Sequence, residues 1–198
     1  MAKIGWGKIL AGVATVAAAG AAYAYLRQRS ARAPIHETLL SDGAYEIRRY
    51  PALLVIETLQ NGTRDRALGN GFGLLADYMF GEGRDGEQIP ITMPVLTAPM
   101  ADGVWRIRFR IPEGLDRDSL EVPGPGIAIA EIPAREVAVV SVPGKPTDRL
   151  FAAKTAELQR WMQARRYKST GPAELAYYNS PLKPGTSDPN EVLFPLTG

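Results

Sequence analysis

The feature that most limits the fold of this 198-residue chain is an order of predicted elements that occurs twice. Residues 44–59 alternate in polarity and are rich in β-forming residues, with a break at Pro51. Residues 64–80 then carry apolar side chains at helical spacing. The apolar run 89–100 and the alternating stretch 104–112 follow as strands. The first half is therefore predicted to run strand, strand, helix, strand, strand.

The second half repeats this order at low sequence identity. Residues 127–144 form a strand pair broken at Pro133, and residues 147–166 form a helix with Thr147 at its N-cap. The stretches AELAYYNSP and NEVLFPL supply two more strands. We expect an α+β fold: a distorted, mostly antiparallel β-barrel with two helices, built from a duplicated unit and preceded by an N-terminal hydrophobic helix. A groove beside such a sheet is a common ligand site.

The run IPITMPVLTAPM, residues 89–100, contains three prolines in an otherwise strand-like pattern. Proline has no backbone N–H to donate, so it is normally confined to edges, strand starts and bulges. We expect this segment to bend or end at an edge of the sheet, beside the groove.

The N-terminal region is a separate object. Residues 9–26 are uncharged and long enough for a membrane helix, so residues 1–32 are predicted as a membrane anchor or as a signal peptide cleaved near Ala24. Residues 33–43 are expected to form a linker, and 44–198 the folded domain. The anchor predicts a bacterial-type cell membrane with the domain in the periplasm. A cytoplasm-facing or secreted domain stays open, and alanine stripes in the anchor would admit other membrane helices.

Composition excludes several classes of function. The chain has no cysteine, which removes disulfides, thiolate catalysis and cysteine-bound metals. Without the five basic residues of the first 32 positions, 18 Lys and Arg face 21 Asp and Glu, so the domain does not resemble a nucleic-acid binder. GEGRDG fits a dinucleotide fingerprint by letters but follows a helix, so it is predicted as a turn. One histidine, His36, cannot build a triad or a zinc site from a linker. We expect a protein that is not an enzyme.

Two sets of side chains could form a binding site, and each has a structural alternative. Arg106, Arg108 and Arg110 lie on one strand face, either as a solvated surface or as a clamp for carboxylates or phosphates. An apolar set could be core packing or the wall of a pocket for a flat ligand. Its members are Met79, Phe80, Ile91, Met93, Val95 and Met100.

Several motifs in order resemble the SOUL (haem-binding protein) family. They are YEIRRYPALLVIET, LLADYMFGEG, IPITMPVLT, WRIRFRIP and YNSPLKPGTSDPNEVLFPL, spread over residues 40–196. The third is similar to the family's I-x-M-T-x-P-V segment, with Ile91 where methionine is usual. The last departs from the family at Asp188-Pro189, where arginines are typical, and at Leu193, which replaces tryptophan.

The resemblance implies a barrel with two helices that binds haem or another tetrapyrrole through an apolar surface. Arg49 stands where some members place a histidine, and a protonated arginine cannot ligate iron. A basic residue that contacts haem propionates in other members falls on Arg106, whereas a helix arginine of that kind falls near Gly69 and is missing. His36 could replace the histidine only if the linker folds back.

Together these observations predict a site in which a porphyrin lies on Met79, Phe80 and Met93 with a propionate near Arg106. Any axial ligand would be methionine, tyrosine or His36. The first hypothesis is a membrane-tethered, non-enzymatic tetrapyrrole carrier or buffer. The alternative is an accessory or structural subunit of a larger membrane complex, held by the transmembrane helix and without haem. A third is a sensor domain for small apolar effectors.

Overall fold

The computed structural model describes residues 36–81, 88–101, 103–144, 147–178 and 189–197. The predicted anchor or signal segment, residues 1–32, lies outside the described residues. Within the described part of the chain, no helix is both long enough and apolar enough to cross a membrane.

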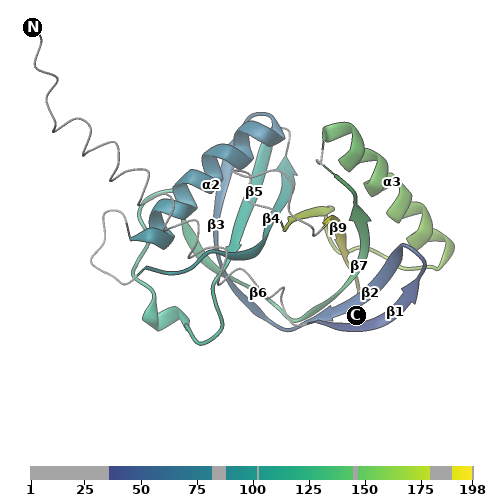
Figure 1. The fold of residues 1–198 in the computed structure, drawn as a ribbon, viewed down its shortest axis with the longest axis horizontal. Coiled ribbons are helices and arrows are strands. Elements are labelled where there is room, and N and C mark those ends of the chain that lie inside the picture. The colour runs from purple at the N-terminus through teal and green to yellow at the C-terminus, as the bar shows by residue number, and fades with distance from the viewer. Residues whose placement is uncertain (1–35, 82–87, 102, 145–146, 179–188, 198) are drawn as a thin grey trace, which may run out of the picture.

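The described chain folds into one antiparallel sheet and two α-helices, as the α+β prediction required (Figure 1). A short 3-10 helix, Arg117–Ser119, lies between β5 (Val104–Arg110) and β6 (Ala128–Ile132). The strands are β1 (Glu37–Asp42), β2 (Tyr45–Tyr50), β3 (Leu53–Asn61), β4 (Thr92–Ala101), β5 (Val104–Arg110), β6 (Ala128–Ile132), β7 (Arg135–Val142), β8 (Glu174–Tyr177) and β9 (Asn190–Pro195). The helices are α2 (Arg64–Phe80) and α3 (Asp148–Ala164).

The strand order is β1-β2-β7-β9-β8-β4-β5-β3-β6, with every neighbouring pair antiparallel. The sheet curls but does not close, so the expected barrel is a half-barrel with β1 and β6 at its edges (Figure 1). The predicted order of elements holds in both halves. If the strands of the first half (β2, β3, β4, β5) are exchanged with their counterparts in the second half (β6, β7, β8, β9), every pair of neighbouring strands between β2 and β6 in the sheet is mapped onto another such pair. Their origin by duplication stays a prediction.

The expected linker, residues 33–43, contains an additional strand. Residues 37–42 form β1, which pairs with β2 along one edge of the sheet. This strand is mostly exposed and carries little apolar alternation, so the pattern that reveals buried strands is absent from it.

The run 89–100 is not at an edge, and that expectation is corrected. Most of it belongs to β4, which lies in the interior of the sheet between β8 and β5. The register with β5 shifts between Thr92 and Leu96 and again between Pro99 and Ala101. Pro94 falls within the first irregularity and Pro99 borders the second, so β-bulges accommodate residues that cannot donate to the ladder.

The two helices pack on the outer face of the curled sheet. Gly71 of α2 lies so close to β5 that a Cβ there would be 2.9 Å from Ile107 Cγ1, which explains one glycine in this helix. The α3 helix begins at the predicted cap, where the Thr147 hydroxyl accepts a hydrogen bond from the Leu150 N–H at 3.2 Å. Between helices and sheet lies the helix-side core, which includes Ile56, Leu75, Met79, Ile107, Phe109, Leu158 and Leu175.

The opposite face of the sheet, here called the inner face, has a smaller apolar cluster. Its buried members are Tyr50, Val55, Leu96, Ile132, Val137, Val139, Ala176 and Leu193. They come from β6 at one edge and from β2 and β7 near the other, because the sheet curls toward this face. Charged residues lie among them, so this face is where a site has to be sought.

Candidate functional site: a hollow on the inner face

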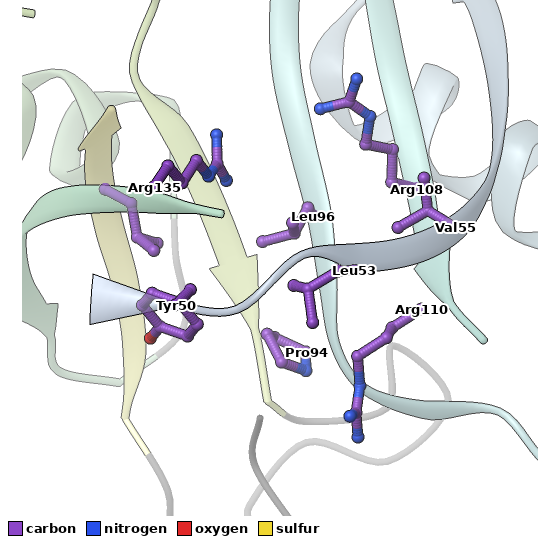
Figure 2. Close-up of a pocket in the computed structure, with 9 residues that line it drawn as sticks. Tyr50, Leu53, Val55, Pro94, Leu96, Arg108, Arg110 and Arg135 are labelled. Carbon is purple, nitrogen blue, oxygen red and sulfur yellow. The ribbon is translucent and has the colours of Figure 1, made fainter. Parts of the chain in front are cut away.

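The inner face has a hollow of about 450 Å³, a volume that includes open solvent at its mouth. Figure 2 shows its walls converging from several strands. Apolar side chains and three arginines line it: Tyr50, Leu53, Val55, Pro94, Leu96, Arg108, Arg110, Arg135 and Leu193. An apolar floor with a few charged groups at its border is typical of a small-molecule site.

The three arginines of β5 lie on the inner face, as their alternation with Ile107 and Phe109 predicts. Ile107 and Phe109 are fully buried in the helix-side core. The arginine side chains lie on the opposite face of β5, next to side chains of the neighbouring strands. Arg108, for example, is in register with Glu57 of β3 and with Leu96 of β4. Neither alternative from the sequence describes the three arginines completely. They are not a solvated surface, and as an anion clamp they would be incomplete, because carboxylates of the protein already neutralise part of their charge.

Arg108 and Arg135 are held by carboxylates. Arg108 Nε is 2.7 Å from Glu57 Oε2, and its Nη1 is 3.6 Å from Glu174 Oε1. Arg135 donates two parallel hydrogen bonds to Glu174, at 3.1 and 2.5 Å. Only 4% of the Glu174 side chain is exposed, so two arginines neutralise a buried carboxylate.

Arg106 differs from its neighbours. Among the described residues it has no ion pair, and its Nε is buried without a hydrogen-bond partner. Burial lowers the pKa of Arg106, and the positive charge of Arg108 lowers it further. The guanidinium remains charged, so an anion beside it would be stabilised, although Arg106 itself is not among the residues that line the hollow. Burial also lowers the pKa of Arg110, which lies 3.7 Å from the exposed carboxylate of Glu113.

A second network lies on the β2 and β9 side. Arg48 binds Glu191 through two nitrogens, at 3.1 and 2.9 Å, and the Tyr178 hydroxyl donates to Glu191 at 2.7 Å. Arg48 also donates to the Tyr50 hydroxyl at 3.4 Å. The Tyr50 hydroxyl therefore belongs to this network, and in Figure 2 it points away from Leu53 and Pro94. The ring of Tyr50 is what lines the hollow.

The structure does not bring the predicted site residues together. Met79 is fully buried in the helix-side core, and Phe80 and Met93 pack against the same core. Arg106 is on the inner face, so the sheet separates it from the predicted methionine wall. The apolar set is core packing for Met79, Ile91 and Val95, whereas Met100 is exposed.

Arg49 and His36 have other surroundings than expected. Arg49 is half-exposed on the outer side of β2 and pairs with Glu37 and Glu136, each at 2.9 Å. His36 packs on Tyr50 with ring centroids 5.2 Å apart, so its ring contacts a residue that lines the hollow. His36 is nevertheless not among the residues that line it.

Four candidate residues at or near the hollow are not predicted from the sequence: Tyr50, Arg135, Glu174 and Glu191. Glu174 and Glu191 offered a signal, because each is a carboxylate within a short strand of otherwise apolar character. A buried glutamate in such a strand requires a cationic partner. Which arginine supplies it depends on strand pairings that are distant in sequence.

A family model described as SOUL heme-binding protein matches residues 32–195. The chain belongs to this family. The match begins before β1 and covers both halves of the sheet, in agreement with the motifs seen in the sequence. No curated protein matches this SOUL protein.

Solved structures resemble this SOUL protein in fold. The EcmrR C-terminal domain has a TM-score of 0.61 at 14% identity, covering 82% of this chain and 98% of that one. A cryo-EM structure of an EcmrR–DNA complex gives 0.59 at 14% identity, with 96% and 68% covered. A crystal structure described as a hydrolase from Listeria innocua gives 0.56 at 10% identity, with 80% and 94% covered. At these identities the likeness concerns the fold alone.

The hollow of this SOUL protein suits the macrocycle and the propionates of haem better than it suits the iron. Apolar side chains and the Tyr50 ring suit a flat macrocycle, and the arginines, with the buried unpartnered Nε of Arg106, suit its carboxylates. No histidine or methionine is among the described residues that line the hollow. In chemical character the residues present therefore suit the macrocycle and its propionates, and they leave the iron without an evident axial donor.

Proposed function

We propose that this SOUL protein binds haem or another tetrapyrrole non-covalently in the inner-face hollow and acts as a carrier or buffer. The observation that supports this most strongly is the border of the apolar hollow. Arg108, Arg110 and Arg135 line it, and Arg106 lies beyond them with a buried nitrogen that has no partner among the described residues. An amphipathic anion would contact the apolar floor and compensate this charge.

The residues of the chain have separate tasks in this proposal. The Tyr50 ring and the side chains of Leu53 and Leu193 contact the macrocycle, while Arg110 at the hollow attracts its carboxylates. Arg106, two positions before Arg108 on β5, adds positive charge next to the hollow. Bound haem itself would supply the visible absorbance and the redox-active iron. The hollow opens to solvent and is too small to enclose a whole macrocycle, so part of such a ligand would stay in solvent, which suits reversible binding.

We propose binding without catalysis. The groups that border the hollow are hydrocarbon, an aromatic ring and guanidinium groups, and a guanidinium does not exchange protons near neutral pH. General acid–base catalysis requires groups whose pKa lies near the working pH. The fold shared with a structure described as a hydrolase adds no catalytic residue to this chain.

We also propose that residues 9–26 tether the domain to a membrane, with the domain in the periplasm. The support is the uncharged run between Lys8 and Arg27, which is long enough to span a bilayer. The alternative function, an accessory subunit of a membrane complex, would use the same helix and no tetrapyrrole. Purification of the full chain in mild detergent separates the two, because a carrier emerges alone and a subunit emerges with constant partners.

A titration of the full chain with haemin tests tetrapyrrole binding. We expect a saturable change near the Soret band at micromolar haemin. Arg106→Ala should weaken binding about tenfold, because a charge-assisted contact is lost. Arg49→Ala is the matched control, since this arginine lies on the other side of β2, and it should leave the affinity unchanged.

The outcomes are distinct. Absence of saturable binding would refute the proposed function. Binding that Arg49→Ala weakens and Arg106→Ala does not would keep the ligand but move the site away from the inner face. Circular dichroism of both variants checks that the fold is intact.

A further inference from the structure

Strands β2 and β3 form one long ribbon with strands β7 and β6. Tyr50 lies opposite Arg135 at the end of the β2–β7 pair. Leu53 lies opposite Ile132 at the start of the β3–β6 pair, and two residues separate the pairs on each strand, so the register is unbroken. In Figure 2 the chain from Tyr50 to Leu53 crosses the strand that carries Leu96, and all three residues line the hollow.

The junction between the two strand pairs consists of two identical dipeptides. Pro51-Ala52 on one strand and Pro133-Ala134 on the other lie outside the ladder, and all four residues are exposed. Proline has no backbone N–H with which to bind the opposite strand. The ladder is therefore interrupted at the same place in both strands, and the ribbon is weakest there.

The ribbon is hydrogen-bonded to neighbouring strands on both sides of this junction. The Ile111 N–H donates to the Leu54 carbonyl at 2.9 Å, and the Leu196 N–H donates to the Glu136 carbonyl at 2.9 Å. Beyond these two points, β3 pairs with β5 and β7 pairs with β9. The segment between them consists of residues 50–53 and 132–135 and is here called the strap.

The strap forms one wall of the hollow. Tyr50, Leu53 and Arg135 line the hollow from the strap, and Leu96 and Arg108 line it from the sheet. The hollow measures about 450 Å³ with its open mouth included. A larger molecule can enter it fully only if the strap moves away from the sheet.

Glu174 of β8 attaches the strap to the sheet. Arg135 donates two hydrogen bonds to Glu174, at 3.1 and 2.5 Å, whereas the Tyr50 hydroxyl accepts only a longer one, at 3.4 Å, from Arg48. Arg108 reaches the same carboxylate from the opposite wall, with its Nη1 3.6 Å from Glu174 Oε1. If Arg135 moves away with the strap, Glu174 keeps Arg108 as a counter-ion and gains water through the opened hollow. The carboxylate is then not left as an isolated buried charge, which would be far more costly.

We propose that the strap is a hinged cover of the hollow, and that Glu174 is its latch, shared between the moving Arg135 and the stationary Arg108. In the open state the strap bends away from the sheet at the Pro-Ala junction, and solutes reach the inner-face cluster beneath it. Such an opening is local, because it leaves the helix-side core intact. It controls entry to the hollow whatever the ligand is, so this proposal does not depend on tetrapyrrole binding.

The chain has no cysteine, so a single introduced thiol reports the opening without interference. Ala176 and Ala138 are both fully buried, Ala176 in the inner-face cluster and Ala138 in the helix-side core. In the full chain we expect a thiol reagent to label Ala176→Cys at least about 100-fold faster than Ala138→Cys, because local opening exposes only the first. Low concentrations of urea should hardly change the labelling rate of Ala176→Cys and should strongly raise that of Ala138→Cys, which requires global unfolding.

Two arginine substitutions test the latch, because they should act in opposite directions on the labelling of Ala176→Cys. Arg135→Met removes the partner that holds the strap and should raise the labelling rate at least about tenfold. Arg108→Met removes the partner that Glu174 keeps in the open state, so it should lower the rate about tenfold. A mere loss of stability would raise the rate in both variants. Arg49→Met is the matched control, since Arg49 pairs on the other side of β2, and it should leave the rate unchanged.

The outcomes lead to different conclusions. Equal labelling rates for Ala176→Cys and Ala138→Cys, with equal dependence on urea, would mean that the strap does not open, and the proposal would be overturned. Faster labelling in both arginine variants would overturn the role of Glu174 as the latch. Circular dichroism checks the fold, and if Ala176→Cys does not fold, Leu96→Cys at the wall of the hollow replaces it. These measurements use no porphyrin, so a failure of the strap and a failure of the proposed function are recognised separately.

Discussion

The two faces of the sheet bury side chains by different means. The outer face packs against α2 and α3, and its core is apolar, with Leu75, Met79 and Phe109 at zero exposure. The inner face has no helix over it among the described elements, and it buries charged pairs such as Arg135–Glu174 beside a smaller apolar cluster. Buried ion pairs contribute little net stability, because desolvation offsets their attraction. The difference suggests that one face supports the fold and the other is available for a ligand.

The largest expected effect is a difference between two leucine truncations. Leu75→Ala removes a fully buried side chain from the helix-side core and should lower the free energy of unfolding by about 3 to 5 kcal/mol. Leu53→Ala removes a partly buried side chain at the wall of the hollow, and it should cost less than about 1.5 kcal/mol. Urea denaturation measures both. Equal losses would mean that the inner face is as important to stability as the helix-side core.

Much of the fold follows from periodicity in the sequence. The predicted helix 64–80 matches α2, and the breaks at Pro51 and Pro133 fall between strands. The alternation in β5 also divides its residues correctly between two faces. Periodicity is a local property, so these features needed no knowledge of distant contacts.

The site depends on information that periodicity lacks. Alternation does not say which strand face the helices cover, so the sequence leaves open whether Met79 is core packing or the wall of a pocket, and the structure places it in the helix-side core. The partners of Glu174 come from β5 and β7, which are brought together only by the strand order. Similarly, β1 was missed because its exposed residues carry no clear pattern, although its pairing with β2 defines an edge.

The second comparison concerns ion pairs in different surroundings. Arg135→Met leaves Glu174 with Arg108 alone, at 3.6 Å, and we expect a loss of about 2 to 3 kcal/mol from an undercompensated buried charge. Arg49→Met breaks two pairs whose arginine is half-exposed, and the unfolding midpoint should hardly move. Thermal and urea unfolding of both variants measure this. If Arg49→Met destabilised the protein more than Arg135→Met, the Glu174 carboxylate would have to be hydrated in solution, and the prediction would be wrong.

The sharpest comparison uses two adjacent tyrosines with opposite orientations near the end of β8. The Tyr178 hydroxyl, on the inner side, donates to the buried Glu191 carboxylate at 2.7 Å. The Tyr177 hydroxyl faces the helix side beside Thr97, and among the described residues neither oxygen has a hydrogen-bond partner of normal geometry. Burial raises the pKa of Tyr177 to about 12, so its hydroxyl is protonated at neutral pH.

Removal of each hydroxyl should therefore have unequal effects. Tyr178→Phe deletes a hydrogen bond to a charged group and leaves Glu191 less satisfied, so we expect a loss of about 1.5 kcal/mol. Tyr177→Phe deletes a buried hydroxyl that has no hydrogen-bond partner of normal geometry among the described residues, so stability should stay constant or rise slightly. Urea denaturation at neutral pH gives both values. A loss at Tyr177 as large as that at Tyr178 would show that its hydroxyl does have a partner in solution, and the outer face would then be less purely apolar than its packing indicates.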